Sequence, residues 1–193
     1  MILALVCAAL AAIPEGVRPA AAPADAPAQY EKAFPRKPGL ACAPLLPEHA
    51  LLCFRVWEGQ KRRWVTVADL TAWQTDLDAL VSHVTKGAQK VLENEPTAQK
   101  VVDMDAVYHD LRDGDGWAVA PLVAGSREKL VRVAIPSTGV FLTWEAGSPE
   151  LDRVMAVGVR EIYEASEDAV TPMVHVWRDG RFVPFVQAKP TGG

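Results

Sequence analysis

The clearest hydrophobic pattern in the chain lies in its last third. Apolar residues dominate Leu130–Ile135 and Val140–Trp144, and the turn sequence Pro136–Gly139 separates them, which predicts two adjacent strands. Ser148 and Pro149 then begin a segment in which apolar residues recur every three or four positions. A Ser N-cap followed by Pro at the first helical position is typical of an amphipathic helix.

The chain closes with a predicted β-hairpin. Two alternating apolar segments, Val174–Arg178 and Arg181–Phe185, flank an Asp-Gly pair, which is the strongest short signal for a hairpin turn. Pro184 has no backbone N–H to donate, so the last strand is expected at a sheet edge. Such an edge can receive a strand from a partner. The candidate binding residues on this strand are Arg181 and Phe185.

The pattern in the first half predicts a strand followed by two helices. An apolar run over Leu51–Trp57 precedes a turn at 58–60 and a partner strand near 64–66. Thr66 and Asp69 have the spacing of a capping box, which predicts a short helix to Trp73. A longer helix is expected from an N-cap at Thr75, and Pro96 ends it.

The middle of the chain is less regular. Residues 99–111 predict two short strands separated by 103–105, and Asp113–Gly116 predicts a turn. Residues 117–124 are expected to form a short helix. Together the elements predict an α+β fold, in which one antiparallel-rich mixed sheet over residues 50–187 packs against two main helices.

The N-terminal residues differ from the rest of the chain. Ile2–Ile13 is an unbroken apolar run with the length of a signal-peptide core, and it is too short to span a bilayer. Cleavage patterns of the A-x-A type occur at 9–11 and 20–22, although no Lys or Arg follows Met1. We expect a leader over residues 1–22, an Ala/Pro-rich arm over 23–49 and a flexible tail over 188–193.

Composition and cysteine content narrow the range of partners and compartments. The 193 residues carry a net charge of −4, so binding to nucleic acid is not expected, and Lys61–Arg63 is interpreted as a solvated turn. Cys42 and Cys53 form an even pair once a leader is removed. In an oxidising compartment they can form a disulfide worth about 3 kcal/mol, and the alternative is two buried thiols.

The sequence contains no recognisable catalytic, phosphate-binding or metal-binding motif, so neither a cofactor nor a metal site is predicted. The acidic residues between 103 and 115 fail the spacing of a calcium loop and are interpreted as turn residues. Among the six tryptophans, Trp73 and Trp117 adjoin helix boundaries and are candidates to line a binding groove. The tryptophans assigned to strands are interpreted as core or half-buried residues: Trp57, Trp144 and Trp177.

Residues 65–184 resemble the DUF1444 (YtpQ-like) family of unknown function. The resemblance rests on Val67–Trp73, Asp113–Trp117, Val133–Pro136 with Val140–Leu142, the helix after Ser148, and Trp177–Gly180. It implies a mixed α+β fold and supplies no catalytic residues. The leader and the Pro-rich arm depart from what the family implies.

These observations predict an exported, non-enzymatic binding or accessory module, periplasmic or secreted, that holds a protein or peptide partner. A cytoplasmic location is the alternative if Ile2–Ile13 is not a leader. A second hypothesis is a hydrolase or metal-dependent enzyme. Its site would draw on His109, Asp110, Asp113 and His175. A third is a structural protein tethered to the cell envelope by an uncleaved leader.

Overall fold

A computed structural model describes residues 13–59, 61–94, 98–100, 106–110, 131–138, 140–179 and 181–185 of the chain. Within 87–94, 98–100 and 106–110 it describes the backbone alone. The predicted α+β class is confirmed, because helices and antiparallel sheets alternate along the described chain. The strands form two sheets, where a single mixed sheet was expected, and every described pairing is antiparallel.

The four-stranded sheet is built around β3. On one side β3 pairs along most of its length with β1, and on the other side it pairs first with β2 and then with β4. Its apolar sequence suits this central position, because most of its first seven residues are buried. The strands are β1 (Val17–Pro23), β2 (Cys42–Leu46), β3 (Ala50–Glu58) and β4 (Lys61–Trp64).

The six-stranded sheet has the order β10-β9-β7-β8-β6-β5. The predicted C-terminal hairpin is confirmed as β9 and β10, and β10 lies at the sheet edge, as Pro184 required. The strands are β5 (Ala98–Lys100), β6 (Ala106–Asp110), β7 (Val131–Ser137), β8 (Val140–Glu145), β9 (Val174–Arg178) and β10 (Arg181–Pro184).

Four helices are described: α1 (Ala26–Ala33), α2 (Val67–Ala72), α3 (Leu77–Asn94) and α5 (Pro149–Ala165). Three of them start as local sequence signals require. Asp69 accepts hydrogen bonds from the backbone N–H and the hydroxyl of Thr66 at 2.7 and 2.8 Å, which completes the capping box of α2. Ser148 caps α5 by accepting from the Leu151 N–H. Asp76, and not Thr75 as predicted, caps α3.

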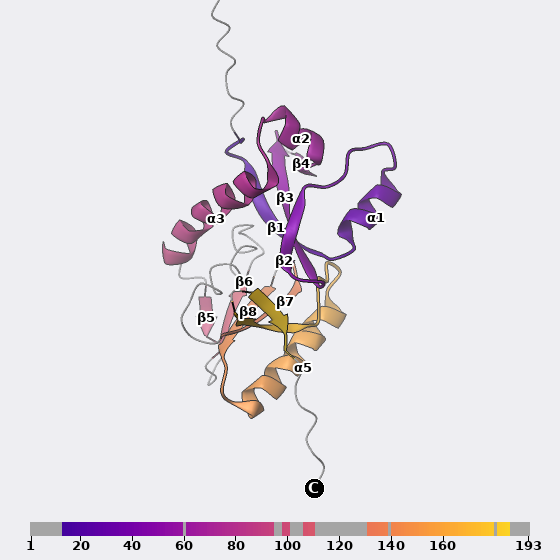
Figure 1. Cartoon of the computed structure of the whole chain (residues 1–193). Helices are drawn as coiled ribbons and strands as arrows, with labels where there is room; N and C mark the ends of the chain where they lie inside the picture. Colours follow the sequence, from indigo (N-terminus) through magenta and orange to yellow (C-terminus); the bar gives the residue numbers. More distant parts are fainter. Residues whose placement is uncertain are drawn as a thin grey trace, which may run out of the picture.

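Two apolar cores give the molecule its layers. The first core lies between the two sheets and includes Phe54, Leu52, Ile135 and Phe182, with Leu80 of α3. The second core lies on the other face of the six-stranded sheet, where α5 covers it. In Figure 1 the four-stranded sheet therefore lies above the six-stranded one, and α5 forms the opposite side. Strand β7 is buried on both faces, which explains its nearly continuous apolar sequence.

The N-terminal part of the chain corrects the predicted boundary at residue 50. Residues expected to form a leader and an arm instead supply β1, α1 and β2. Alanines 20–22, a predicted cleavage pattern, are buried in β1, where they pair with β3. Proline and alanine suggested an arm, but Pro19 and Pro44 sit in outer strands of the sheet, where a missing N–H is tolerated. Residues 1–12 and 188–193 lie outside the described chain.

The basic cluster at 61–63 is also a correction. It was interpreted as a turn, whereas it forms most of β4, and Gly59 with a φ of 64° makes the turn before it. Arg63 is held by Asp69 of α2 and by Glu58 of β3, with N–O distances of 2.8 and 2.6 Å. The other two basic side chains of the strand are exposed to solvent.

Candidate functional site

The outer face of the four-stranded sheet carries an alternating set of arginines and tryptophans. Antiparallel register places Arg55 opposite Trp64 and Trp57 opposite Arg62, while Arg18 of β1 lies opposite Arg55 on the other side. Side chains of paired residues share a face of the sheet, and the apolar residues between them point into the first core. We call this set, Arg18, Arg55, Trp57, Arg62 and Trp64, the arginine–tryptophan face.

Two cation–π contacts order this face. The guanidinium of Arg55 lies 4.3 Å from the ring centre of Trp64, and that of Arg62 lies 5.2 Å from the ring centre of Trp57. A guanidinium can stack on an indole ring and form hydrogen bonds in its own plane at the same time. The face therefore combines flat aromatic surface with positively charged groups.

A groove of about 530 Å³ begins at one side of this face. Its volume falls within the range of about 300–1,000 Å³ that is usual for ligand sites. It runs between α1, the end of β1, and the segments at Thr138 and 167–169. The lining residues that carry polar or aromatic groups are Gln29, Tyr30, Arg55, Trp64, Thr138, Glu167 and Asp168.

The groove has charges of both signs. Arg55 is on the sheet side, and Glu167 and Asp168 are on the opposite segment, which follows α5. Asp168 is fixed there, because its carboxylate accepts from the Thr138 hydroxyl and its carbonyl oxygen accepts from the Thr138 N–H at 3.1 Å. A ligand with both an acidic and a basic group, as a peptide segment often has, would meet complementary charges on the two sides.

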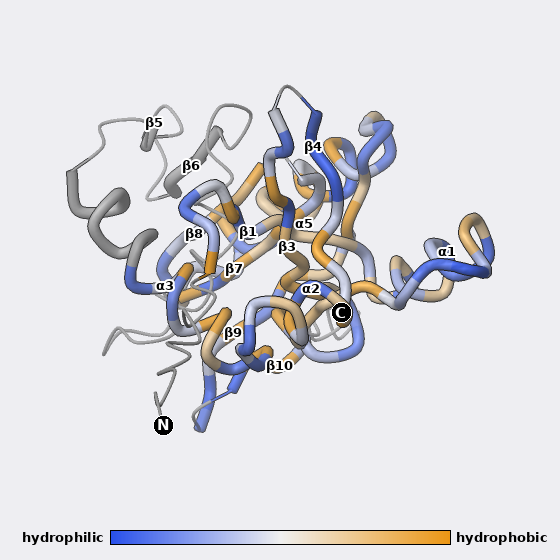
Figure 2. Tube along the Cα trace, turned by 90° about the horizontal axis from the view of Figure 1, so that it is seen from above, coloured by the Kyte–Doolittle hydropathy of each residue, from blue (hydrophilic) through white to orange (hydrophobic). Residues whose placement is uncertain are grey.

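Helix α1 forms the remaining wall and stands away from the body of the protein. It has no buried residue, and both views show it projecting beyond the sheets (Figures 1 and 2). The rings of Tyr30 and Phe34 contact each other in a tilted arrangement with centres 5.0 Å apart, and the Lys37 ammonium lies 4.6 Å from the Phe34 ring centre. A short helix with no buried face gains little from packing, so further contact on its groove side would stabilise it.

Two histidines meet between the sheets. His49, in the turn that joins β2 to β3, contacts His175 of β9 with ring centres 5.1 Å apart. His175 is fully buried. Its Nδ1 lies 3.2 Å from the carbonyl oxygen of Met173, and its Nε2 has no hydrogen-bond partner in the described chain. Burial, and then the proximity of His49, lower the pKa of His175 to about 4, so the ring is neutral near pH 7.

A buried ion pair holds α5 on the six-stranded sheet. Arg132 of β7 donates to both carboxylate oxygens of Asp152 at 3.3 Å, and the indole N–H of Trp144 donates to the same carboxylate at 2.8 Å. The Arg132 guanidinium also lies 3.7 Å from the ring centre of Phe185. Because every member of this cluster is engaged with another, its role is structural.

The predicted site residues are distributed over several places. Trp73 packs against the first core and Phe185 against the second, and neither lines the groove. Arg181 is exposed on the edge strand β10. Trp144 is buried as predicted, whereas Trp57 is 50% exposed. Trp117, Asp113 and the side chains of His109 and Asp110 lie outside the described residues.

Sequence reasoning missed the arginine–tryptophan face, although the chain contains a signal for it. Arg55-Val-Trp57 and Arg62-Arg-Trp64 flank a short turn, and an antiparallel hairpin centred on that turn must pair each arginine with a tryptophan. The interpretation of 61–63 as a turn hid this pairing. The missed groove residues Tyr30 and Glu167 are distant in sequence and offer no comparable signal.

Within the described ranges, no group of three or more His, Cys, Asp or Glu side chains is placed to hold a metal ion. No helix in the same part of the chain has both the length and the apolar character needed to cross a membrane. Comparisons with protein-family models, curated proteins and solved structures found no match to this chain. The resemblance to the DUF1444 family thus stays a prediction from the sequence.

Proposed function

We propose that this protein is an exported, non-enzymatic binding module whose groove beside α1 holds a peptide segment of a partner protein. The observation that carries the proposal is the groove wall formed by α1. This helix buries none of its residues in the fold, yet Ala26, Gln29 and Tyr30 line a groove of about 530 Å³. A bound segment would supply the apolar contacts that α1 lacks.

The chemistry of the groove supports a peptide as the ligand. Arg55, stacked on Trp64, places a positive charge on one side of the groove, and Glu167 places a negative charge on the opposite segment. Tryptophan, tyrosine and arginine are the residues that most often contribute large shares of binding energy at protein interfaces. Three of the groove residues are of these types.

Export is supported by two features at the N-terminal end. Ile2–Ile13 has the composition of a signal-peptide core, and Cys42 and Cys53 form a disulfide across β2 and β3. Disulfides persist chiefly in oxidising compartments, such as the bacterial periplasm or the extracellular space. We therefore propose that the module works outside the cytosol.

Selection from a random peptide library on the immobilised protein tests the function. Dissociation constants of the selected peptides would then be measured by fluorescence polarisation for the wild type and two pairs of variants. Arg55→Gln and Trp64→Ala are expected to weaken binding at least about tenfold, because both residues line the groove. Arg62→Gln and Trp57→Ala, the matching pair outside the groove, are expected to change it less than about twofold.

Thermal unfolding of each variant provides the control for folding. If the two pairs weaken binding equally, or if no peptide is selected, the groove is not a peptide site. If peptides bind and neither pair matters, the partner is held elsewhere and the proposal for the groove fails.

A further inference from the structure

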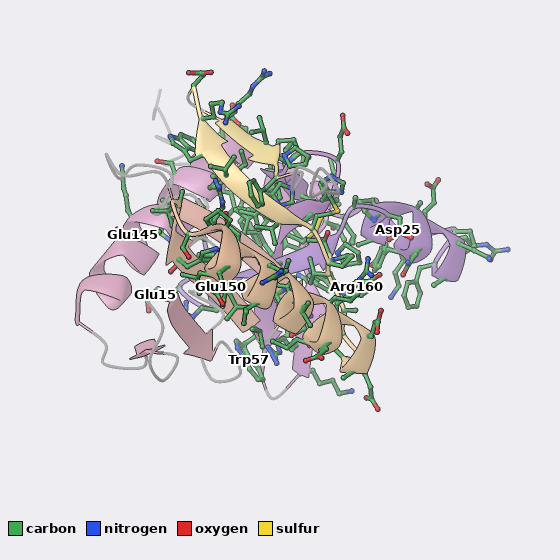
Figure 3. The ribbon with its side chains drawn as sticks, turned by 90° about the horizontal axis from the view of Figure 1, so that it is seen from below. Glu15, Asp25, Trp57, Glu145, Glu150 and Arg160 are labelled. Atoms are coloured by element: carbon green, nitrogen blue, oxygen red, sulfur yellow. A yellow bond between two sulfur atoms is a disulfide. The ribbon has the colours of Figure 1, made fainter. Side chains whose placement is uncertain are left out.

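The outer surface of α5 carries apolar side chains that the fold leaves in water. Val154 and Val157 are 43% and 54% exposed, whereas Met155 and Val159 on the inner side of the helix belong to the second core. Figure 3 shows α5 in front of the sheets when the molecule is viewed from below. Valine is a weak helix former. These two valines therefore add little to the core or to the helix, and they are placed to contact another surface.

Gly158 lies next to these valines, one helical turn after Val154. A glycine inside a helix lowers the stability of that helix relative to alanine. A Cβ built on Gly158 would meet no atom within 4 Å outside its own stretch of helix backbone, so packing within the described chain does not require a glycine here. The missing side chain does allow the backbone of a second molecule to approach α5 closely.

The charged residues of this surface lie along one row of the helix. Arg153, Val157 and Glu161 follow one another at intervals of four residues, and both charged side chains are exposed. The residues three and four positions from Glu161 are Val157, Gly158, Glu164 and Ala165, none of which is basic. The helix therefore offers Glu161 no cationic partner. Because the row begins with a cation and ends with an anion, it is complementary to a copy of itself that runs in the opposite direction.

We propose that two copies of the protein associate through this surface of α5, with the two helices antiparallel about a two-fold axis near Val157. Helices that pack through their i±4 rows cross at about 50°, and the rows of the two helices then run alongside each other. Two-fold symmetry makes every contact occur twice. Arg153 of each copy would therefore meet Glu161 of the other copy, and the exposed valines would lie between the two ion pairs.

The other charges of α5 are compatible with this arrangement. Glu150 and Glu164 are each seven residues from Val157, which corresponds to about 10 Å along the helix axis. Two helices that cross at about 50° have diverged at that distance, so these acids of the two copies are kept apart. Arg160 is two positions from Gly158 and therefore lies on the other side of the helix, away from the contact.

Dimerisation through α5 goes beyond the proposed peptide binding and does not depend on it, since no residue of this surface lines the groove. The segment that follows α5 does line the groove, at 167–169, so a dimer would carry two grooves. A partner with two suitable segments would then bind more tightly through avidity. One helix per copy makes a small interface, so we expect a weak dimer with a dissociation constant on the order of 100 µM.

Sedimentation velocity of the full-length protein over a range of concentrations tests the proposal. The wild type is expected to shift from monomer to dimer as its concentration rises to about 500 µM. Arg153→Glu alone and Glu161→Arg alone should each weaken dimerisation about tenfold, because each variant places like charges opposite each other twice. The double variant Arg153→Glu with Glu161→Arg exchanges the two charges and should restore the dimerisation of the wild type.

Substitution at the two-fold axis gives a second test. Val157→Lys should weaken dimerisation more than about tenfold, since it brings two ammonium groups together at the axis. Val67→Lys on α2 is the matched control, because Val67 is also 54% exposed. Arg160→Glu is the control for the charge reversals, because it makes the same change of charge on the other side of α5. Both controls should leave dimerisation unchanged.

Thermal unfolding of each variant checks that the fold is kept. A wild type that stays monomeric at every concentration would overturn the proposal. A dimer that survives Val157→Lys would overturn it as well, because another surface would then form the contact. Single charge reversals that the double variant does not rescue would exclude the antiparallel arrangement. Arg55→Gln, which tests the groove, should not alter dimerisation, so the two proposals fail separately.

Discussion

Helices α5 and α1 illustrate two different relations between a helix and a sheet in one molecule. Helix α5 covers the six-stranded sheet with buried Met155 and Val159, and its first turn carries the buried Asp152. Helix α1 is half as long, buries no residue, and stands beside the four-stranded sheet. The fold therefore has one side where polar groups are sealed inside and one side where aromatic and charged groups remain exposed.

Two Arg–Asp pairs in the described part of the chain show the same contrast. The side chains of Arg132 and Asp152 are 12% and 6% exposed, whereas those of Arg63 and Asp69 are 37% and 16% exposed. A buried pair is costly to break because the remaining charge loses both its partner and its water. A partly exposed pair is screened by solvent and contributes less. The pair that is costly to break thus lies on the α5 side, whereas the groove proposed to bind a peptide lies beside α1.

The largest effect is expected at the buried pair. Asp152→Ala should lower the free energy of unfolding by about 3–5 kcal/mol, because it leaves the Arg132 guanidinium and the Trp144 N–H unpaired inside the protein. Urea unfolding would measure the loss. Glu150→Gln, an exposed acid in the same first turn, serves as control and should cost only a few tenths of a kcal/mol. Equal losses for the two variants would show that Asp152 acts only through the helix dipole.

The contact between the two sheets is expected to be sensitive to acid. The pKa of His175 is lowered from 6.5 to about 4 by burial, so the unfolded chain takes up its proton first as pH falls. The stability contributed by the neutral ring is complete above pH 6.5 and decreases as pH falls from 6.5 towards 4, by about 3 kcal/mol in total.

His175→Leu should remove this part of the pH dependence while keeping the core filled. His83→Gln, which changes an exposed histidine of α3, should leave the pH dependence intact. The measurement is urea unfolding at a series of pH values. A pH profile that is the same in wild type and His175→Leu would place the acid sensitivity on another group.

The disulfide links β2 to β3 within the four-stranded sheet. Cys42 and Cys53 close a loop with a sequence separation of 11, and the chain-entropy relation gives about 3 kcal/mol for a loop of this length. Replacing both cysteines with alanine should lower the free energy of unfolding by about that amount. The midpoint of thermal unfolding should fall accordingly. Addition of a reductant should lower the wild-type midpoint similarly and leave the double variant unchanged. A wild type that is insensitive to reductant would show that the bond contributes little.

The smallest change in stability is expected on α1. Tyr30→Ala should alter the free energy of unfolding by less than about 0.5 kcal/mol, since the helix buries no residue. On α5, Met155→Ala should cost about 2–5 kcal/mol, because Met155 is part of the second core. Tyr30→Ala should nevertheless weaken peptide binding in the groove. A large loss of stability from Tyr30→Ala would show that α1 belongs to the core of the fold.

Prediction from sequence succeeded where the signal is local. The capping residues Thr66 and Ser148, and the hairpin around Asp179, each act over a few neighbouring positions, and each was found as predicted. It failed for β1 and β2, because a strand rich in Ala and Pro has low intrinsic β-propensity and forms only through pairing with β3. The groove was not predictable for the same reason, since its walls come from residues between 21 and 169.

The sequence by itself determined the α+β class, the position of the two main helices and the C-terminal hairpin, because helix periodicity, caps and turn residues act locally. Only the tertiary structure decided that the strands separate into two sheets and that Cys42 faces Cys53. It also decided that His49 meets His175 between the sheets, and that Arg55 and Trp64 border a groove with Glu167. These contacts depend on strand pairings between distant segments, and their stability comes from burial of apolar surface that no local pattern specifies.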